Sequence, residues 1–247
     1  MRRAFILIGL VGCGHSDAPE APVRTRVPED APRLLTVGAH EPIDAKPIVI
    51  ENVELGEPPA SMVVVTSEPK FYIDRTEVTV GAYRECVEAS ACEPPDLEKW
   101  KTWDAQRAVT FVSAQQAWDY CAYRGKRLPT SKEWLRAALG EDGRKYPWGN
   151  ATPSCKFAVL GNCAKDVAKV GTKPAGASPY GALDMAGNVH EYINDNTSGK
   201  RESIDSAVSG GDLSTEPSEL AGVFDQRSGY ALAGEETGFR CVRTPRS

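Results

Sequence analysis

Cysteine has the widest chemistry of the residue types in this chain of 247 residues, because a thiol can form a disulfide, bind a soft metal ion or act as a nucleophile. Seven cysteines are present, and Cys13 stands apart near the N-terminus. The other six allow many disulfide connectivities, but local spacing favours two short pairs and leaves one long-range pair. The expected disulfides are Cys86–Cys92, Cys155–Cys163 and Cys121–Cys241. Zinc is the competing interpretation, and it is disfavoured because the chain has no C-x-x-C pair and three histidines.

His190 is the histidine placed for acid–base chemistry, since Glu191 and Asp195 lie close to it in the sequence. An imidazole titrates near neutrality and could act as a general base. The alternative interpretation is a planar ring that only fills space. A Ser-His-Asp triad would have to recruit His190, and no Gly-x-Ser-x-Gly turn supports one.

The elements that must position these residues begin near residue 61. Residues 62–65 and 71–74 are rich in β-branched and aromatic side chains, which predicts two strands. Thr79 is a predicted N-cap for a helix through Glu88. Ser113 with Gln116, and Thr130 with Glu133, form capping-box patterns for two further helices. Glycine, proline and asparagine then accumulate, so the sequence predicts an α+β domain with long loops and short strands.

The N-terminal region indicates an exported protein. Two arginines and a short apolar stretch precede the sequence LVGC at residues 10–13, which resembles a bacterial lipobox. We therefore expect a signal peptide over residues 1–12 and a lipid on Cys13, with a plain secretory peptide and an incidental cysteine as the alternative. Residues 13–60 are rich in proline, alanine and glutamate, which favours an extended tether. Residues 61–247 form the expected domain.

The overall composition indicates which classes of binding partner are unfavourable for this chain. The formal net charge is −5 and no basic stripe is present, which argues against a nucleic-acid partner. No apolar run after the N-terminus is long enough to span a bilayer.

Five motifs occur in an order that resembles one known family. They are GKRLPT at residues 125–130, YPWGN at 146–150, GALDMAGNVHEY at 181–192, SGG at 209–211 and GFRC at 238–241. In this order they resemble the formylglycine-generating enzyme (sulfatase-modifying factor) family over residues 61–244. The resemblance implies a loop-rich variant of the C-type-lectin-like fold, and its active members oxidise a sulfatase cysteine to formylglycine.

The resemblance also implies a calcium site in the loop at residues 184–191. Matched residue by residue, Asp184 and Glu191 would supply carboxylate oxygens, and Gly187 and Val189 would supply backbone carbonyls. Calcium prefers such oxygen ligands. The alternative interpretation is that the two carboxylates cap backbone amides in the loop.

The catalytic cysteine pair of the family is missing. By register from the glycine pair at residues 210–211, Thr215 and Leu220 hold the two positions, and Asp212 stands where the family has serine. Neither side chain can replace a thiolate, so copper is not expected. The resemblance places His190 where relatives carry tryptophan. His190, Asp212 and Arg227 are the candidates to line a binding cleft, in which an arginine could hold a carboxylate.

We therefore expect a lipid-anchored protein of the bacterial cell envelope, at the outer membrane or cell surface. Its domain is expected to be a non-catalytic binding or scaffold module for a peptide, protein or glycan. The alternatives are an active sulfatase-modifying oxidase that uses another centre, and a purely structural envelope lipoprotein.

Overall fold

The computed structural model describes residues 60–196, 207–225 and 233–245. Backbone contacts divide the chain into two units, residues 1–48 and 49–247, and the described residues all lie in the second. The expected signal peptide and tether up to residue 59, with Cys13, lie outside the described residues, as does Arg227. No helix in the described part of the chain has the length and apolar character needed to cross a membrane.

The three helices predicted from caps are confirmed. Thr79 Oγ1 accepts a hydrogen bond from the Ala82 amide at 3.1 Å and begins α1 (Val80–Glu88). Complete capping boxes begin α2 (Ala114–Tyr123) at Ser113 and α3 (Ser131–Leu139) at Thr130. A fourth helix, α4 (Leu220–Asp225), has no cap signal in the sequence and was not predicted. Short 3₁₀ turns occupy Glu98–Thr102, Gly161–Cys163 and Pro174–Gly176.

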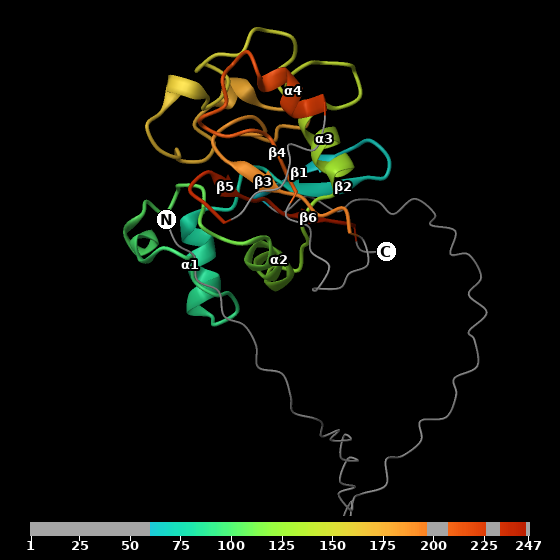
Figure 1. The fold of residues 1–247 in the computed structure, drawn as a ribbon. Helices are drawn as coiled ribbons and strands as arrows, with labels where there is room; N and C mark the ends of the chain where they lie inside the picture. Colours follow the sequence, from blue (N-terminus) through green and yellow to red (C-terminus); the bar gives the residue numbers. More distant parts are fainter. Residues whose placement is uncertain (1–59, 197–206, 226–232, 246–247) are drawn as a thin grey trace, which may run out of the picture. The chain divides into compact units, whose positions relative to one another are not determined.

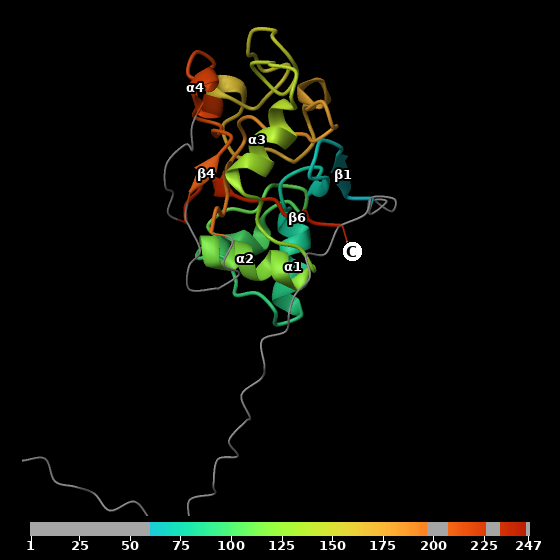
Figure 2. The same ribbon diagram turned by 90° about the vertical axis from the view of Figure 1, so that its right-hand side faces the viewer.

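Two small sheets run between the helices. In the first, the predicted strands β1 (Met62–Val65) and β2 (Phe71–Asp74) pair antiparallel, and β2 pairs antiparallel with β6 (Val242–Arg243). In the second, β3 (His190–Tyr192) lies between antiparallel β4 (Val208–Ser209) and parallel β5 (Thr237–Gly238). Figure 1 shows α1 and α2 on one side of the strands and α3 and α4 on the other, and Figure 2 shows the same arrangement after a 90° turn.

The two largest of the three apolar clusters in the described residues lie on opposite sides of the strands (Figure 1). Trp134 of α3 and Leu220 of α4 pack with Phe71 and Ile73 of β2 on one side. Tyr83 of α1 and Tyr120 of α2 pack with Phe239 on the other. Apolar burial on both sides fixes the strands in place, which matters because no strand among the described residues exceeds four residues.

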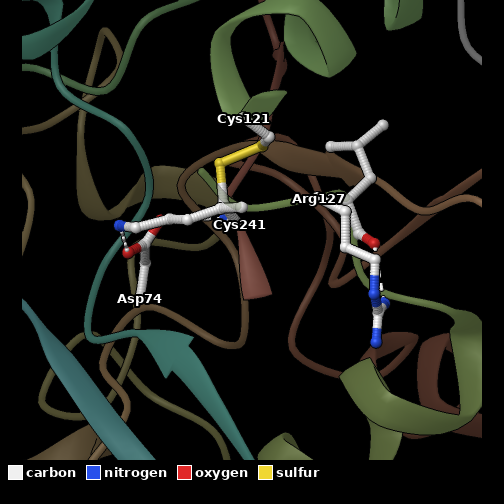
Figure 3. Close-up of a disulfide and its surroundings, with 6 residues drawn as sticks. Asp74, Cys121, Arg127 and Cys241 are labelled. Atoms are coloured by element: carbon white, nitrogen blue, oxygen red, sulfur yellow. Dashed lines mark hydrogen bonds and ion pairs between the residues drawn. A yellow bond between two sulfur atoms is a disulfide. The ribbon is translucent and has the colours of Figure 1, made fainter. Parts of the chain in front are cut away.

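All three expected disulfides are present: Cys86–Cys92, Cys155–Cys163 and Cys121–Cys241. The first two close short loops. The third joins α2 to the chain just before β6, and Figure 3 shows it beside Asp74 and Arg127. The α+β, disulfide-stapled architecture predicted from the sequence is therefore confirmed.

Candidate functional site

The two positions of the family cysteine pair have structural roles. Leu220 begins α4 with 0% of its surface exposed and belongs to the core around Trp134. Thr215 Oγ1 accepts a hydrogen bond from the Asp212 amide at 3.0 Å and donates one to Asp212 Oδ1 at 3.1 Å, so it closes the turn after the glycine pair. All six cysteines of the described residues are joined in disulfides. The described domain therefore holds no thiolate for copper.

A polar cluster forms where β3, β5 and this turn meet. His190 Nε2 lies 3.2 Å from Asp212 Oδ2, and the His190 side chain is 26% exposed. Its Nδ1 atom is buried without a hydrogen-bond partner. Asp212 also accepts from the hydroxyl and amide of Ser214 at 2.8 and 2.9 Å, and its carboxyl shares a hydrogen bond with Glu236. The structure thus brings two of the three predicted cleft residues, His190 and Asp212, together.

The pKa values in this cluster define its protonation. Burial lowers the pKa of His190, although Asp212 opposes the shift. Burial raises the pKa of Asp212, but the Ser214 hydrogen bonds and His190 outweigh it, and the net shift is downward. The pKa of Glu236 is raised, first by burial and then by the Asp212 charge. Near neutral pH, His190 is therefore uncharged and Asp212 ionised, and Glu236 binds a proton more readily than an isolated glutamate does.

The cluster is built for hydrogen bonding rather than nucleophilic attack. A catalytic serine must donate to the histidine base, but the Ser214 hydroxyl donates to Asp212 instead. The uncharged imidazole leaves its buried Nδ1 as an unused acceptor.

A buried ion pair lies one residue along β3. Arg240 and Glu191 are both 0% exposed. Arg240 Nε and Nη2 donate to the two carboxylate oxygens of Glu191 at 2.7 Å each, and Trp134 Nε1 donates to Oε2 at 2.8 Å. The remaining Arg240 donors reach the backbone carbonyls of Asp74, Arg75, Leu183 and Asp184. One guanidinium thus joins β2, β3 and the loop at residues 183–184.

This ion pair bears on the calcium ligand set that the resemblance implies, and that set stays a prediction. Glu191 was expected to supply a calcium ligand, but its carboxylate already accepts three hydrogen bonds and its charge is balanced by Arg240. Gly187 and Val189 do lie in a tight loop. Gly187 has φ +74°, and a Cβ there would lie 2.2 Å from the Val159 carbonyl oxygen, so only glycine fits. Asp184 Oδ2 accepts from the Gly171 amide, which is the loop-cap role given as the alternative.

Glu77, which the sequence analysis did not single out, lies in the same region. It is 2% exposed and its Oε1 accepts from Asn188 Nδ2 at 2.8 Å, while Oε2 is buried without a partner. Burial and the nearby Asp184 charge hold the pKa of Glu77 well above its usual value. No sequence pattern marks Glu77, because only the fold brings it to the 184–191 loop.

Metal ligation by side chains alone is limited. Within the described ranges, no three acidic, histidine or cysteine side chains converge closely enough to hold a metal ion. A cation at the 184–191 loop would therefore need backbone carbonyls or water as well, which calcium accepts. Glu77 Oε2 is a buried oxygen without a hydrogen-bond partner beside this loop.

A pocket of about 160 Å³ lies beside the Cys121–Cys241 disulfide. Its lining includes Asp74, Glu77, Tyr120 and Lys126, and none of the residues predicted to form a site. Lys126 is already ion-paired with Asp74, whose other oxygen accepts from the Cys241 amide at 2.9 Å. Glu77, which is otherwise buried, therefore lines a pocket that also contains charged side chains.

Sequence comparison identifies relatives with different activities in their names. The chain is 31% identical over 209 residues to "Hercynine oxygenase" of Mycolicibacterium smegmatis, covering 68% of this chain and 48% of that protein. It is 44% identical over 94 residues to "Inactive C-alpha-formylglycine-generating enzyme 2" of Bos taurus, covering 34% of this chain and 31% of that protein. The chain thus spans about half the length of the first relative and less of the second.

Structural comparison supports the fold. PvdO from Pseudomonas aeruginosa superposes with a TM-score of 0.55 at 18% identity, over 71% of this chain and 80% of that one. The profile "Sulfatase-modifying factor enzyme 1-like domain" matches residues 36–245. The match covers the helices, both sheets, the glycine-pair turn and the GFRC motif that carries Arg240. The chain therefore belongs to the formylglycine-generating enzyme family, with its loop-rich variant of the lectin-like fold.

Proposed function

We propose that this protein is a lipid-anchored protein of the bacterial cell envelope whose formylglycine-generating-enzyme-like domain is a non-catalytic binding or scaffold module. The observation that carries the proposal is the structural role of the residues at positions 215 and 220, where active family members have their two cysteines. Thr215 closes a turn and Leu220 is core, while every described cysteine is held in a disulfide. A relative named as an inactive enzyme supports the view that this domain persists without the oxidase reaction.

The proposed binding surface is the polar cluster of His190, Asp212, Ser214 and Glu236. It combines a partly exposed imidazole, an ionised carboxylate and a carboxyl whose pKa is raised. A peptide, protein or glycan that presents amide or hydroxyl donors would satisfy these acceptors. Arg227 is proposed to contribute from outside the described residues.

The purified domain is expected to form no formylglycine from a sulfatase-type cysteine peptide, even with copper and reductant. The expected aldehyde yield is that of a no-protein control, measured by peptide mass spectrometry. The variant Thr215→Cys/Leu220→Cys is expected to stay inactive, because Asp212 and His190 would still differ from the family pattern. An active family enzyme serves as the positive control. Copper-dependent aldehyde from the wild type would refute the proposal and favour an oxidase that uses another centre.

Cys13 is expected to carry the lipid anchor. The full chain, expressed in a bacterium fed labelled palmitate, should incorporate label and sediment with membranes, and Cys13→Ser should lose both properties. Cys86→Ser is the matched control, because it removes a cysteine without touching the lipobox-like sequence. Equal labelling of the wild type and Cys13→Ser would rule out lipidation at this residue.

A further inference from the structure

We propose that the pocket beside the Cys121–Cys241 disulfide binds a small oxyanion, a ligand whose charged group is a carboxylate or a phosphate. The pocket is lined by the N-terminal end of α1, the C-terminal end of α2 and the chain that leaves β2. None of its lining residues belongs to the polar cluster around His190. The inference is therefore independent of the binding surface proposed above.

The pocket has room for a small organic molecule. Its volume is about 160 Å³, close to that of an apolar cavity of about 150 Å³ that holds a benzene molecule. Unlike such a cavity, this pocket is lined mainly by hydroxyl-bearing and charged side chains. Because polar groups that line a pocket fix the orientation and the class of its ligand, their free donors and acceptors indicate what binds.

The two cations of the lining keep free donors. Lys126 Nζ donates to Asp74 Oδ1, and since an ammonium has three N–H groups, two remain. Within the described residues, Arg124 makes one long hydrogen bond, from Nη1 to Glu85 Oε2 at 3.4 Å, so most of its N–H groups remain as well. Asp74 differs, because its second oxygen already accepts from the Cys241 amide at 2.9 Å. The pocket thus offers charged donors beside a carboxylate whose two oxygens are both engaged.

Tyr120 adds a neutral donor that is held in place. The residue is 4% exposed, and its ring packs against Tyr83 and Phe239 at centroid distances of 5.6 and 5.4 Å. Tyr83 and Tyr192 in the same core each donate their hydroxyl to a backbone carbonyl, but the Tyr120 hydroxyl has no hydrogen-bond partner among the described residues. Burial raises the pKa of Tyr120 to about 12, so the hydroxyl keeps its proton. Buried tyrosine hydroxyls are usually paired, so this one, in the wall of a pocket, points to a ligand.

A ligand with anionic oxygens suits these donors. An ammonium, a guanidinium and a phenol each form their strongest hydrogen bonds with a charged oxygen acceptor. Arg124 can turn toward such a ligand at little cost, because its pair with Glu85 lies at the surface, where ion pairs contribute little to stability. Lys126 is already fixed in the wall by Asp74, so its remaining donors are held in position before a ligand arrives.

A cationic ligand is the competing class, because Glu77 also lines the pocket and its Oε2 atom has no hydrogen-bond partner. That oxygen is buried, however, and Asn188 holds the Glu77 carboxylate toward the 184–191 loop at 2.8 Å. A cation in the pocket would also lie close to Lys126 and Arg124, and like charges at short range repel. The observations therefore favour the anion, and the experiment includes both charges.

Amide NMR of the isotope-labelled, disulfide-intact protein tests the proposal, with propanoate and inorganic phosphate as probes. Each should cause saturable shifts at the backbone amides of residues 74–79 and 120–126. Propanamide, which has the shape of propanoate without its charge, and propylammonium should each bind at least about tenfold more weakly than propanoate, because hydrogen bonds to a charged group are the stronger ones. The tighter of the two anions identifies the ligand group as a planar carboxylate or a tetrahedral phosphate.

Two variants locate the site. Arg124→Met and Tyr120→Phe should each weaken binding of the tighter anion by about tenfold, since each removes donors but keeps the apolar part of the side chain. Arg84→Met and Tyr123→Phe are the matched controls, because these residues of α1 and α2 lie outside the pocket. Both controls should bind the anion as the wild type does, and so should His190→Gln.

Three results would overturn the inference: no saturable shift with either anion, propanamide or propylammonium binding as tightly as propanoate, or wild-type affinity in both Arg124→Met and Tyr120→Phe. Thermal melting confirms that the variants are folded. Aldehyde formation by the wild type would refute the proposed function without affecting these binding measurements.

Discussion

Replacing Arg240 with methionine is expected to lower the free energy of unfolding by about 3 to 5 kcal/mol, the cost of leaving a buried charge without its partner. Glu191 would lose both guanidinium hydrogen bonds while remaining fully enclosed. The carbonyls of Leu183 and Asp184 would lose their donor as well. Arg240→Lys is expected to be nearly as costly, because an ammonium cannot reproduce the two-point contact with a carboxylate.

Chemical denaturation of the disulfide-intact domain measures this loss. Arg124→Met is the matched control, since Arg124 pairs with Glu85 at the surface, and it should cost no more than about 1 kcal/mol. The double variant Arg240→Met/Glu191→Gln should be less destabilised than the sum of its single variants, because it removes both buried charges. Equal costs for Arg240→Met and Arg124→Met would show that the buried pair does not hold the domain together.

Removing the Cys121–Cys241 disulfide is expected to destabilise the domain more than removing either short one. It closes a loop of 120 residues, whereas Cys86–Cys92 closes a loop of 6. In the chain-entropy description, the longer loop corresponds to about 5 kcal/mol and the shorter to about 2 kcal/mol. The bond also ties α2 to the end of the chain at a point where β2 and β6 are joined by few backbone hydrogen bonds.

Paired alanine variants test this difference, because both Cys121 and Cys241 are fully enclosed and alanine buries no new polar group. Cys121→Ala/Cys241→Ala should melt well below Cys86→Ala/Cys92→Ala, with intact mass confirming that the other two disulfides remain. A similar melting temperature for the two variants would mean that backbone pairing and core packing already constrain the C-terminal strand. The disulfide would then add little.

The sequence by itself determined the local structure. Thr79, Ser113 and Thr130 each carry the side chain that satisfies the first free amides of a helix, so the helix starts could be predicted. Close spacing favoured two disulfides and left the third pair over, and the structure confirms all three. The missing cysteines at positions 215 and 220 also needed no structure, because residue type alone excludes a thiolate.

Only the tertiary structure decided which partner each buried carboxylate has. Asp184 and Glu191 look equivalent in the sequence. In the structure, however, Arg240, 49 positions from Glu191, donates two hydrogen bonds to the Glu191 carboxylate, whereas the Asp184 carboxylate accepts from a loop amide. Glu77 lies 111 positions from Asn188, and only the folded chain brings the two side chains into hydrogen-bond contact. The physical reason is that caps and short disulfides depend on neighbours within a few residues. The partner of a buried charge, in contrast, is whichever opposite charge the complete fold encloses with it.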